Sequence, residues 1–370
     1  MFDRREANKQ KDLIQQQAVN LLYRYSRILL SWATGCGKTL AALKMIKLYT
    51  SLKGGRGYII CKEKAHLDNF NKDIKAHKMS FINKISKKFL YDSLHKYSGK
   101  GYVDFVILDE CHAITEIRIE HLKKIIGPNT IVILLSATLP SQKSYLFRSF
   151  VGSFYEFNIT VDKAIEKGIL PYPKIYIHEY TLDDIDREEY ERLTLEVEKN
   201  KENYEENPKV YLKNKWVNSG SVRKRALSEM KTDLALSIID QYMKDSRRIV
   251  FTGSKKQAEE IDVNYVHSGL SDKNVIEMKD KFNDEEINSL AVVNMFRESV
   301  NLFNIQKGLI VQLDNVKLSF IQMLGRVFRS SLPEMHIIIV KGTIDDKYLR
   351  NVLKGFNKEY IEYVFKKCIK

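Results

Sequence analysis

The sequence predicts an α/β protein with two lobes, each built on a parallel sheet, and a mostly helical insert between the lobes. The chain has 370 residues, which is more than one compact core usually needs. Short apolar runs alternate with segments of helical periodicity, a pattern typical of parallel sheets covered by helices. These runs form two sets, and a charge-biased stretch separates them.

The first set of apolar runs predicts the strands of an N-terminal lobe. These candidate strands are Ile28–Ser31, Tyr58–Cys61, Val103–Leu108 and Ile131–Leu135. The run at 131–135 is apolar on both faces, as a buried parallel strand must be. After Lys38 the apolar side chains recur at helical spacing, at Ala42, Met45, Ile46 and Tyr49. A strand, a loop and a helix therefore follow one another early in the chain.

The second set predicts a C-terminal lobe of the same kind. Its candidate strands are Arg248–Phe251, Ala291–Asn294, Leu309–Leu313 and Ile337–Val340. We therefore divide the chain into a first lobe at 1–180, a helical insert or linker at 181–235, and a second lobe at 236–370.

The insert combines an acidic half with a basic half. Residues 181–206 hold eleven Asp or Glu against four Lys or Arg, and residues 207–231 hold seven Lys or Arg against one Glu. Two interpretations remain open. The basic half lies along a nucleic acid with Trp216 and Tyr211 stacked on an unpaired base, or the two halves form a self-neutralising helical hairpin that packs Trp216. The basic side chains concerned are Lys209, Lys213, Lys215, Arg223, Lys224 and Arg225.

Composition favours a polyanionic partner. The formal net charge is +14, which points to nucleic acid first and an acidic membrane surface second. The N-terminus is charged and resembles no signal peptide, and the longest apolar run, at 131–135, is too short to span a bilayer. The cysteines Cys36, Cys61, Cys111 and Cys368 form no CxxC pair, so we expect a reducing, cytoplasmic location and no membrane contact.

The segment Trp32–Thr39 predicts a phosphate-binding loop. It follows a predicted strand and opens a predicted helix, which is the context that such a loop requires. Glycines let the backbone N–H groups turn toward phosphate oxygens, and the helix N-terminus adds partial positive charge. We expect Lys38 to reach the β- and γ-phosphates and the Thr39 hydroxyl to hold Mg²⁺. The predicted ATP-binding residues of the loop are Thr34, Gly35, Cys36, Gly37, Lys38 and Thr39.

Two further polar segments end predicted strands of the first lobe. Asp109 and Glu110 follow the run at 103–108, where Asp109 is placed to coordinate Mg²⁺ and Glu110 to take a proton from the attacking water. Ser136 and Thr138 follow the run at 131–135, and their hydroxyls are expected to bond to His112 or Asp109 and couple to the nucleotide.

The segment at 322–329, QMLGRVFR, places two arginines on one helix face. Arg326 and Arg329 are three residues apart, and arginine suits bidentate phosphate contact and transition-state charge. Without the first lobe, a surface helix with two solvated arginines would be the simpler interpretation.

These segments resemble the motifs of superfamily 2 helicases in their usual order. TGCGKT at 34–39, DECH at 109–112, SAT at 136–138 and QMLGRVFR at 322–329 are similar to motifs I, II, III and VI. The segments at 61–74, 248–254 and 290–302 resemble motifs Ia, IV and V. The family implies two RecA-like lobes of the P-loop NTPase class, with ATP and Mg²⁺ as cofactors and one ATP between the lobes.

The resemblance also implies roles for individual residues. Gln15 falls on the glutamine that reads adenine, and Gln322 joins the two arginines near the γ-phosphate, with Arg326 or Arg329 as the arginine finger. Nucleic-acid contacts are implied for Lys62, Lys64, Ser254, Lys255 and Asn294. Motif V departs from the family pattern at three positions, which are Asn294, Ser299 and Asn301.

Within the superfamily, DECH and the run VHSGLSDKN look closer to the DNA-active branch around XPB, the Swi/Snf-type translocases and phage UvsW. This resemblance implies an ATP-dependent DNA translocase or helicase that unwinds, anneals or branch-migrates DNA in recombination or repair. The composition would suit a phage protein, monomeric or weakly oligomeric. The alternatives are a DExH-type RNA helicase and an ATP-gated clamp that holds nucleic acid without separating strands.

Overall fold

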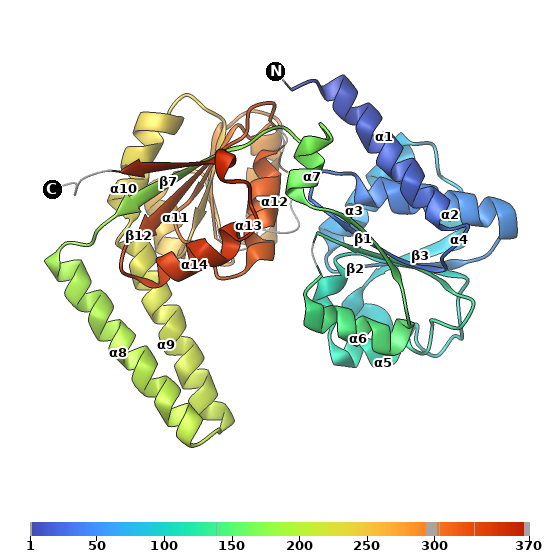
Figure 1. Cartoon of the computed structure of the whole chain (residues 1–370), viewed down its shortest axis with the longest axis horizontal. Helices are drawn as coiled ribbons and strands as arrows, with labels where there is room; N and C mark the ends of the chain where they lie inside the picture. Colours follow the sequence, from blue (N-terminus) through green and yellow to red (C-terminus); the bar gives the residue numbers. More distant parts are fainter. Residues whose placement is uncertain (1, 138, 294–301, 303, 329, 366–370) are drawn as a thin grey trace. The chain divides into compact units, whose positions relative to one another are not determined.

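A computed structural model describes residues 2–137, 139–293, 302, 304–328 and 330–365 of the chain. The chain divides into two compact units, Met1–Pro171 and Tyr172–Lys370 (unit 1 and unit 2), and each is described by itself (Figure 1).

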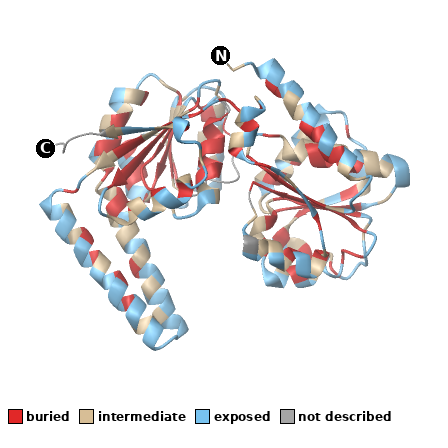
Figure 2. Ribbon diagram, viewed as in Figure 1, coloured by how far each residue is buried: buried red, intermediate tan, exposed pale blue. Residues whose placement is uncertain are grey.

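Unit 1 is built on a six-stranded sheet in the order β3-β2-β4-β5-β1-β6, in which every pair of neighbours is parallel. The strands are β1 (Arg27–Trp32), β2 (Gly57–Cys61), β3 (Ser86–Leu90), β4 (Phe105–Leu108), β5 (Ile131–Ser136) and β6 (Tyr155–Ile159). The central strands β2, β4 and β5 are buried at every residue, as their continuous apolar runs predict (Figure 2).

One helix precedes β1, and the other helices of unit 1 follow its strands. They are α1 (Arg4–Leu21), α2 (Lys38–Lys53), α3 (Lys64–Ala76), α4 (Ile82–Ile85), α5 (Glu116–Leu122), α6 (Ser141–Val151) and α7 (Val161–Glu166), with short 3-10 helices η1 (Tyr91–Lys96) and η2 (Cys111–Ala113). The N-cap of α1 is Asp3, whose carboxylate accepts from Arg5 N at 2.8 Å and so satisfies one of the helix's first N–H groups.

Unit 2 is built on a seven-stranded sheet in the order β13-β7-β12-β11-β8-β10-β9, again with parallel neighbours. The strands are β7 (Lys174–Tyr180), β8 (Arg248–Thr252), β9 (Tyr265–Val266), β10 (Ser289–Val293), β11 (Lys307–Ile310), β12 (Glu334–Val340) and β13 (Ile361–Phe365). Its helices are α8 (Asp184–Glu206), α9 (Val210–Glu229), α10 (Thr232–Ile238), the π-helical turn η3 (Ile239–Met243), α11 (Lys255–Ile261), α12 (Asp272–Asn283), α13 (Lys317–Val327), α14 (Ile344–Leu353) and η4 (Lys358–Tyr360).

Two parallel α/β units confirm the predicted fold class, although some strands and one boundary differ from expectation. Each predicted run coincides with a strand, but β3, β6, β7, β9 and β13 were not predicted. Strand β6 is mostly exposed and carries no apolar run, which explains why the sequence pattern missed it. Strand β7 pairs with β12 in the sheet of unit 2, so the first unit ends at Pro171, before the predicted boundary at residue 180.

The insert is a helical hairpin of unit 2, formed by α8 and α9 (Figure 1). Helix α8 buries a stripe at Tyr190, Leu193, Val197 and Asn200. The rings of Tyr204 on α8 and Trp216 on α9 stack with their centroids 5.8 Å apart. Trp216 is partly buried and packs against the other helix of the hairpin, which favours the hairpin interpretation of the insert.

Among the residues that the structure describes, no helix is both long and apolar enough to cross a membrane. Cys36, Cys61 and Cys111 are buried free thiols.

Candidate nucleotide-binding and catalytic site

The loop between β1 and α2 has the backbone of a phosphate-binding loop. Gly35 and Gly37 have φ of 92° and 83°, in the left-handed region that side chains disfavour. Gly37 is the N-cap of the 16-residue helix α2, so the free N–H groups and the positive end of that helix meet at the loop. The predicted strand, loop and helix are therefore present in the predicted order.

Lys38, the first residue of α2, keeps its ammonium group beside the loop. Its Nζ donates to the carbonyl oxygen of Trp32, the last residue of β1, at 2.7 Å. The hydrogen bond closes the loop on itself and holds a cation at its centre. A cation in this position suits phosphate oxygens that approach from the carboxyl edge of the sheet.

Gln15 connects helix α1 to the same loop. Its side chain is buried, its Nε2 donates to Gly37 O at 3.4 Å, and its Oε1 accepts from Lys44 Nζ at 2.7 Å. A Cβ atom added to Gly37 would lie 2.5 Å from Gln15 Nε2, so this close approach requires glycine as much as the backbone angle does. Gln15 and the loop therefore form one structural unit.

The sheet order brings the acidic segment next to the loop. Strand β5 pairs with β1 on one side and with β4 on the other, and all three are parallel. Their carboxyl ends therefore meet at one edge, with Ser136 at the end of β5 between the phosphate loop and Asp109.

Asp109 is buried beside His66, a residue that sequence reasoning did not select. Its Oδ2 lies 2.8 Å from Nδ1 of His66 on α3, and its carbonyl oxygen accepts from the Tyr91 hydroxyl at 2.8 Å. Burial alone would lower the pKa of His66, but the hydrogen bond to Asp109 and the nearby carboxylates raise it. His66 thus fixes the orientation of the carboxylate that is expected to hold the metal.

Glu110 has an unusual backbone and a strongly ionised side chain. Its φ of 46° is left-handed, a rare conformation for a non-glycine residue that is often found at functional sites. Burial opposes ionisation, but a hydrogen bond from His112 and the positive charge of Lys38 lower the pKa of Glu110 to about 2. The influence of Lys38 reflects how near the loop lies to the DECH segment.

His112 lies between Ser136 and Glu110. Its Nδ1 is 3.2 Å from Ser136 Oγ, with hydrogen-bond geometry, and 3.2 Å from Glu110 Oε2 as an ion-pair contact. This links the end of β5 to the residue expected to activate water. Thr138, expected to share this role, lies outside the described residues.

The donor groups at this edge suit Mg²⁺. The Asp109 carboxylate and the Thr39 hydroxyl on the first turn of α2 both offer oxygen, the ligand type that Mg²⁺ prefers. Protein sites commonly hold Mg²⁺ by one or two carboxylates together with nucleotide phosphates, so these two residues fit that role.

In unit 2, helix α13 carries the residues expected at the γ-phosphate. Gln322 and Arg326 are both buried and lie four residues apart, on one face of the helix. Gln322 Oε1 is buried and accepts no hydrogen bond from the residues described. Arg329 lies outside them.

The residues expected to contact nucleic acid differ in how the structure places them. Lys64 and Lys255 are exposed at the starts of α3 and α11, and Lys62 is partly exposed just before α3. Ser254 is the N-cap of α11, and its hydroxyl accepts from Gln257 N at 3.1 Å, so helix capping already occupies that acceptor. Asn294, together with Ser299 and Asn301, falls outside the described part of the chain.

Two family models match the chain, one within each unit. Residues 5–141 match "Type III restriction enzyme, res subunit", and residues 230–331 match "Helicase conserved C-terminal domain". No curated protein matches the chain.

Solved structures share the fold of nearly the whole chain. A variant of Dbp5 from S. cerevisiae, bound to RNA and ADP BeF3, has a TM-score of 0.65 at 12% identity, over 97% of this chain and 93% of that one. Dbp5 itself, bound to RNA and ADP BeF3, has a TM-score of 0.62 at 12% identity over the same shares. At this identity the likeness shows the fold alone. The two matched domains, one in each RecA-like unit, support a superfamily 2 helicase and indicate an enzyme that hydrolyses ATP.

Proposed function

We propose that this protein is a nucleic-acid-dependent ATPase that uses the hydrolysis cycle to move along or separate strands. The observation that carries the proposal is the convergence of Gln15, the phosphate loop and the DECH segment at one edge of the sheet of unit 1. A nucleotide bound there would contact the Gln15 amide with its adenine and the phosphate loop with its phosphates. The carboxylates of Asp109 and Glu110 would lie beside those phosphates, held by His66 and His112.

In this proposal the residues of unit 1 divide the chemistry among them. Lys38 and the N–H groups of the loop bind the phosphates. Asp109 and Thr39 would hold Mg²⁺, which when bound would neutralise developing charge. Glu110, ionised at neutral pH, orients the attacking water and accepts its proton. His112 contacts that carboxylate, and Ser136 positions His112, so that the end of β5 responds to the state of the site.

Unit 2 completes the site in the proposed cycle. Arg326 donates to the γ-phosphate in the transition state, when charge spreads over its oxygens. Gln322 lies on the same face of α13 and adds an amide to the same contact. Because these groups come from a second unit, hydrolysis is coupled to movement of one unit relative to the other. This movement changes which backbone phosphates of the nucleic acid the protein contacts.

DNA and RNA are equal candidates for the substrate. The expected preference for DNA has no support, because one similarity is to a restriction enzyme subunit and the other is to a protein bound to RNA. The expected roles in recombination or repair, the phage origin and the nearer likeness to XPB and UvsW are equally without support. A protein that distinguishes RNA from DNA does so by contact with the ribose 2′-hydroxyl.

Strand displacement tests whether the protein is a motor or a clamp. A short labelled strand paired to a longer DNA or RNA strand should be released when the protein and ATP are added, and retained with the Glu110→Gln variant. Release by the parent protein alone supports the motor. Equal retention by both proteins, with ATP-dependent binding intact, would make the protein an ATP-gated clamp.

Binding should depend steeply on salt and little on base sequence, since the net charge of +14 suits phosphate contacts. We expect the logarithm of affinity to fall with that of salt by about 0.9 for each phosphate contact on a duplex. Lys64→Ala should reduce this slope by about one, while Lys9→Ala, at an exposed position on α1, should leave it unchanged. A strong sequence preference that persists at high salt would contradict this expectation.

A further inference from the structure

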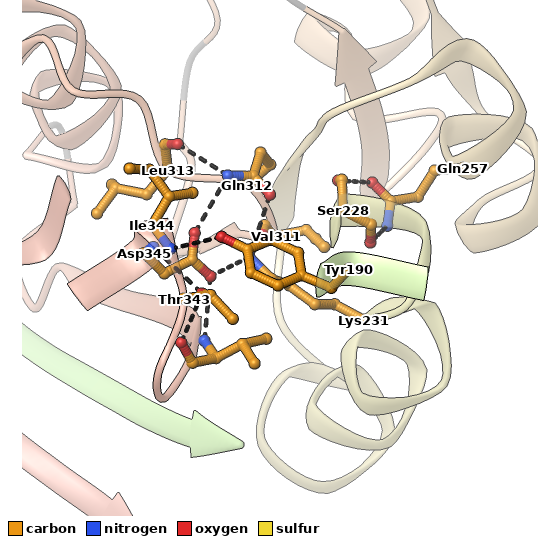
Figure 3. Close-up of polar contacts among 11 residues, drawn as sticks. Tyr190, Ser228, Lys231, Gln257, Val311, Gln312, Leu313, Thr343, Ile344 and Asp345 are labelled. Carbon is orange, nitrogen blue, oxygen red and sulfur yellow. Dashed lines mark hydrogen bonds and ion pairs between the residues drawn. The ribbon is translucent and has the colours of Figure 1, made fainter. Parts of the chain in front are cut away.

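The root of the α8–α9 hairpin is tied to the core of unit 2 by a buried polar network (Figure 3). Lys231, between α9 and α10, has its Nζ 2.6 Å from Asp345 Oδ2, and both side chains are fully buried. The same Nζ donates to Val311 O at 3.0 Å and to Gln312 Oε1 at 3.2 Å. One ammonium group thus joins three segments that are distant in the sequence.

Both helices of the hairpin take part in this attachment. On α8, the Tyr190 hydroxyl accepts from Ile344 N, next to Asp345, at 2.9 Å. On α9, Lys224 forms an ion pair with Asp314. The hairpin is therefore fixed at its root through each of its two helices.

Lys224 and Lys231 both contact the segment at 311–316, which links β11 to α13. Gln312 is fully buried, and its Nε2 donates to Asp345 Oδ1 at 3.2 Å. Val311 and Asp314 receive the other contacts from Lys231 and Lys224. Helix α13 begins immediately after this segment and carries Gln322 and Arg326.

We propose that the hairpin root positions helix α13, so that Lys224 and Lys231 act as positioning residues for Arg326. This inference rests on the proposed function, because Arg326 matters only if it acts on the nucleotide. A buried ion pair is weak evidence for stability, since desolvation offsets much of the attraction between the charges. What the network adds is fixed geometry, because its hydrogen bonds and ion pairs can form together only when the segment and the hairpin root are placed in one way.

The first test uses Lys224→Ala. The ion pair is partly exposed, with side-chain exposures of 32% and 14%, so its loss should leave the fold intact. We expect kcat for ATP at saturating nucleic acid to fall about tenfold, since small misplacements far from the chemistry can cost up to about 10²-fold. The KM for ATP should stay unchanged, and Lys224→Arg should restore kcat. Parental kcat in Lys224→Ala would overturn the inference.

The second test separates positioning from stability. The double variant Lys231→Met with Asp345→Asn removes the ion pair and keeps an acceptor for Val340 N, which Asp345 Oδ2 now provides. Val266→Ala is the matched control, because Val266 is fully buried on β9 at the far edge of the sheet. The double variant should lower kcat per ATP-binding site at a temperature where both variants are folded, and the control should not.

Equal losses of kcat in the double variant and in Val266→Ala would show that the network only stabilises unit 2, and would overturn the inference. A different result would contradict the proposed function itself. If the parent protein shows no nucleic-acid-stimulated hydrolysis, both proposals are wrong, whereas parental stimulation with unaffected root variants refutes the positioning role alone.

Discussion

Arg326→Gln is expected to slow ATP hydrolysis by about 10³-fold, the scale of a lost arginine finger. The neutral amide cannot stabilise the charge that spreads over the γ-phosphate oxygens in the transition state. ATP affinity should change much less, because Lys38 and Gln15, which are expected to bind the ground state, both belong to unit 1. Single-turnover hydrolysis, measured beside equilibrium binding of ATP, checks both expectations.

Arg326 is buried on α13, so the experiment needs a control for folding. Thermal unfolding of the variant should show that the second unit remains folded at the assay temperature, and nucleic-acid affinity without nucleotide should be close to that of the parent. If ATP binding and turnover fall by the same factor, Arg326 holds the ground state and is no arginine finger.

Glu110→Gln is expected to slow hydrolysis by about 10²-fold or more and to leave ATP binding intact. Glutamine has nearly the same shape as glutamate, but it is neutral and cannot take a proton from water. Burial opposes ionisation of Glu110, yet His112 and Lys38 hold its pKa at about 2, so the parent carboxylate is charged throughout the neutral range.

The matched variant is Lys38→Ala, which removes a phosphate contact and should weaken ATP binding as well as turnover. The two variants should therefore differ in their defects. Glu110→Gln should lose hydrolysis alone, and Lys38→Ala should lose both ATP binding and hydrolysis. Hydrolysis by Glu110→Gln at the parental rate would refute the assignment of Glu110 as the base.

The phosphate loop was predictable from sequence because its signal is local. Three elements are consecutive there: the strand at 27–32, the glycines at positive φ and the helix from Lys38. Each has a sequence pattern of its own, namely an apolar run, glycines and helical spacing of apolar residues. The buried strands β4 and β5 were predictable for the same reason, since their runs are apolar on both faces. Strand β6 escaped prediction because it carries exposed polar residues.

His66 was not predictable because its partner is 43 residues away. The contact with Asp109 exists because β2, which leads into α3, pairs with β4. The sequence predicts these strands but not their order in the sheet, so it cannot show that a histidine after one strand meets an aspartate after another.

The insert was predicted as helical, but the roles of its basic residues were not predictable. Arg223 donates to Thr194 Oγ1 at 3.4 Å and lies 5.9 Å from the centre of the Tyr190 ring, and Lys224 pairs with Asp314. Both therefore take part in packing the hairpin and its root. Lys209, Lys213, Lys215 and Arg225 are exposed, and the hypothesis that the basic half contacts a duplex stays a prediction. A run of basic residues does not reveal which carboxylates or rings the fold brings to it.

The most direct test of the central claim is the ATPase rate with single-stranded DNA, duplex DNA, forked DNA and RNA, each compared with protein alone. We predict that at least one nucleic acid raises the rate and that Glu110→Gln abolishes the increase. The nucleic acid that stimulates most also decides between DNA and RNA. A rate that is the same with and without every nucleic acid, or an increase that survives in Glu110→Gln, would contradict the account.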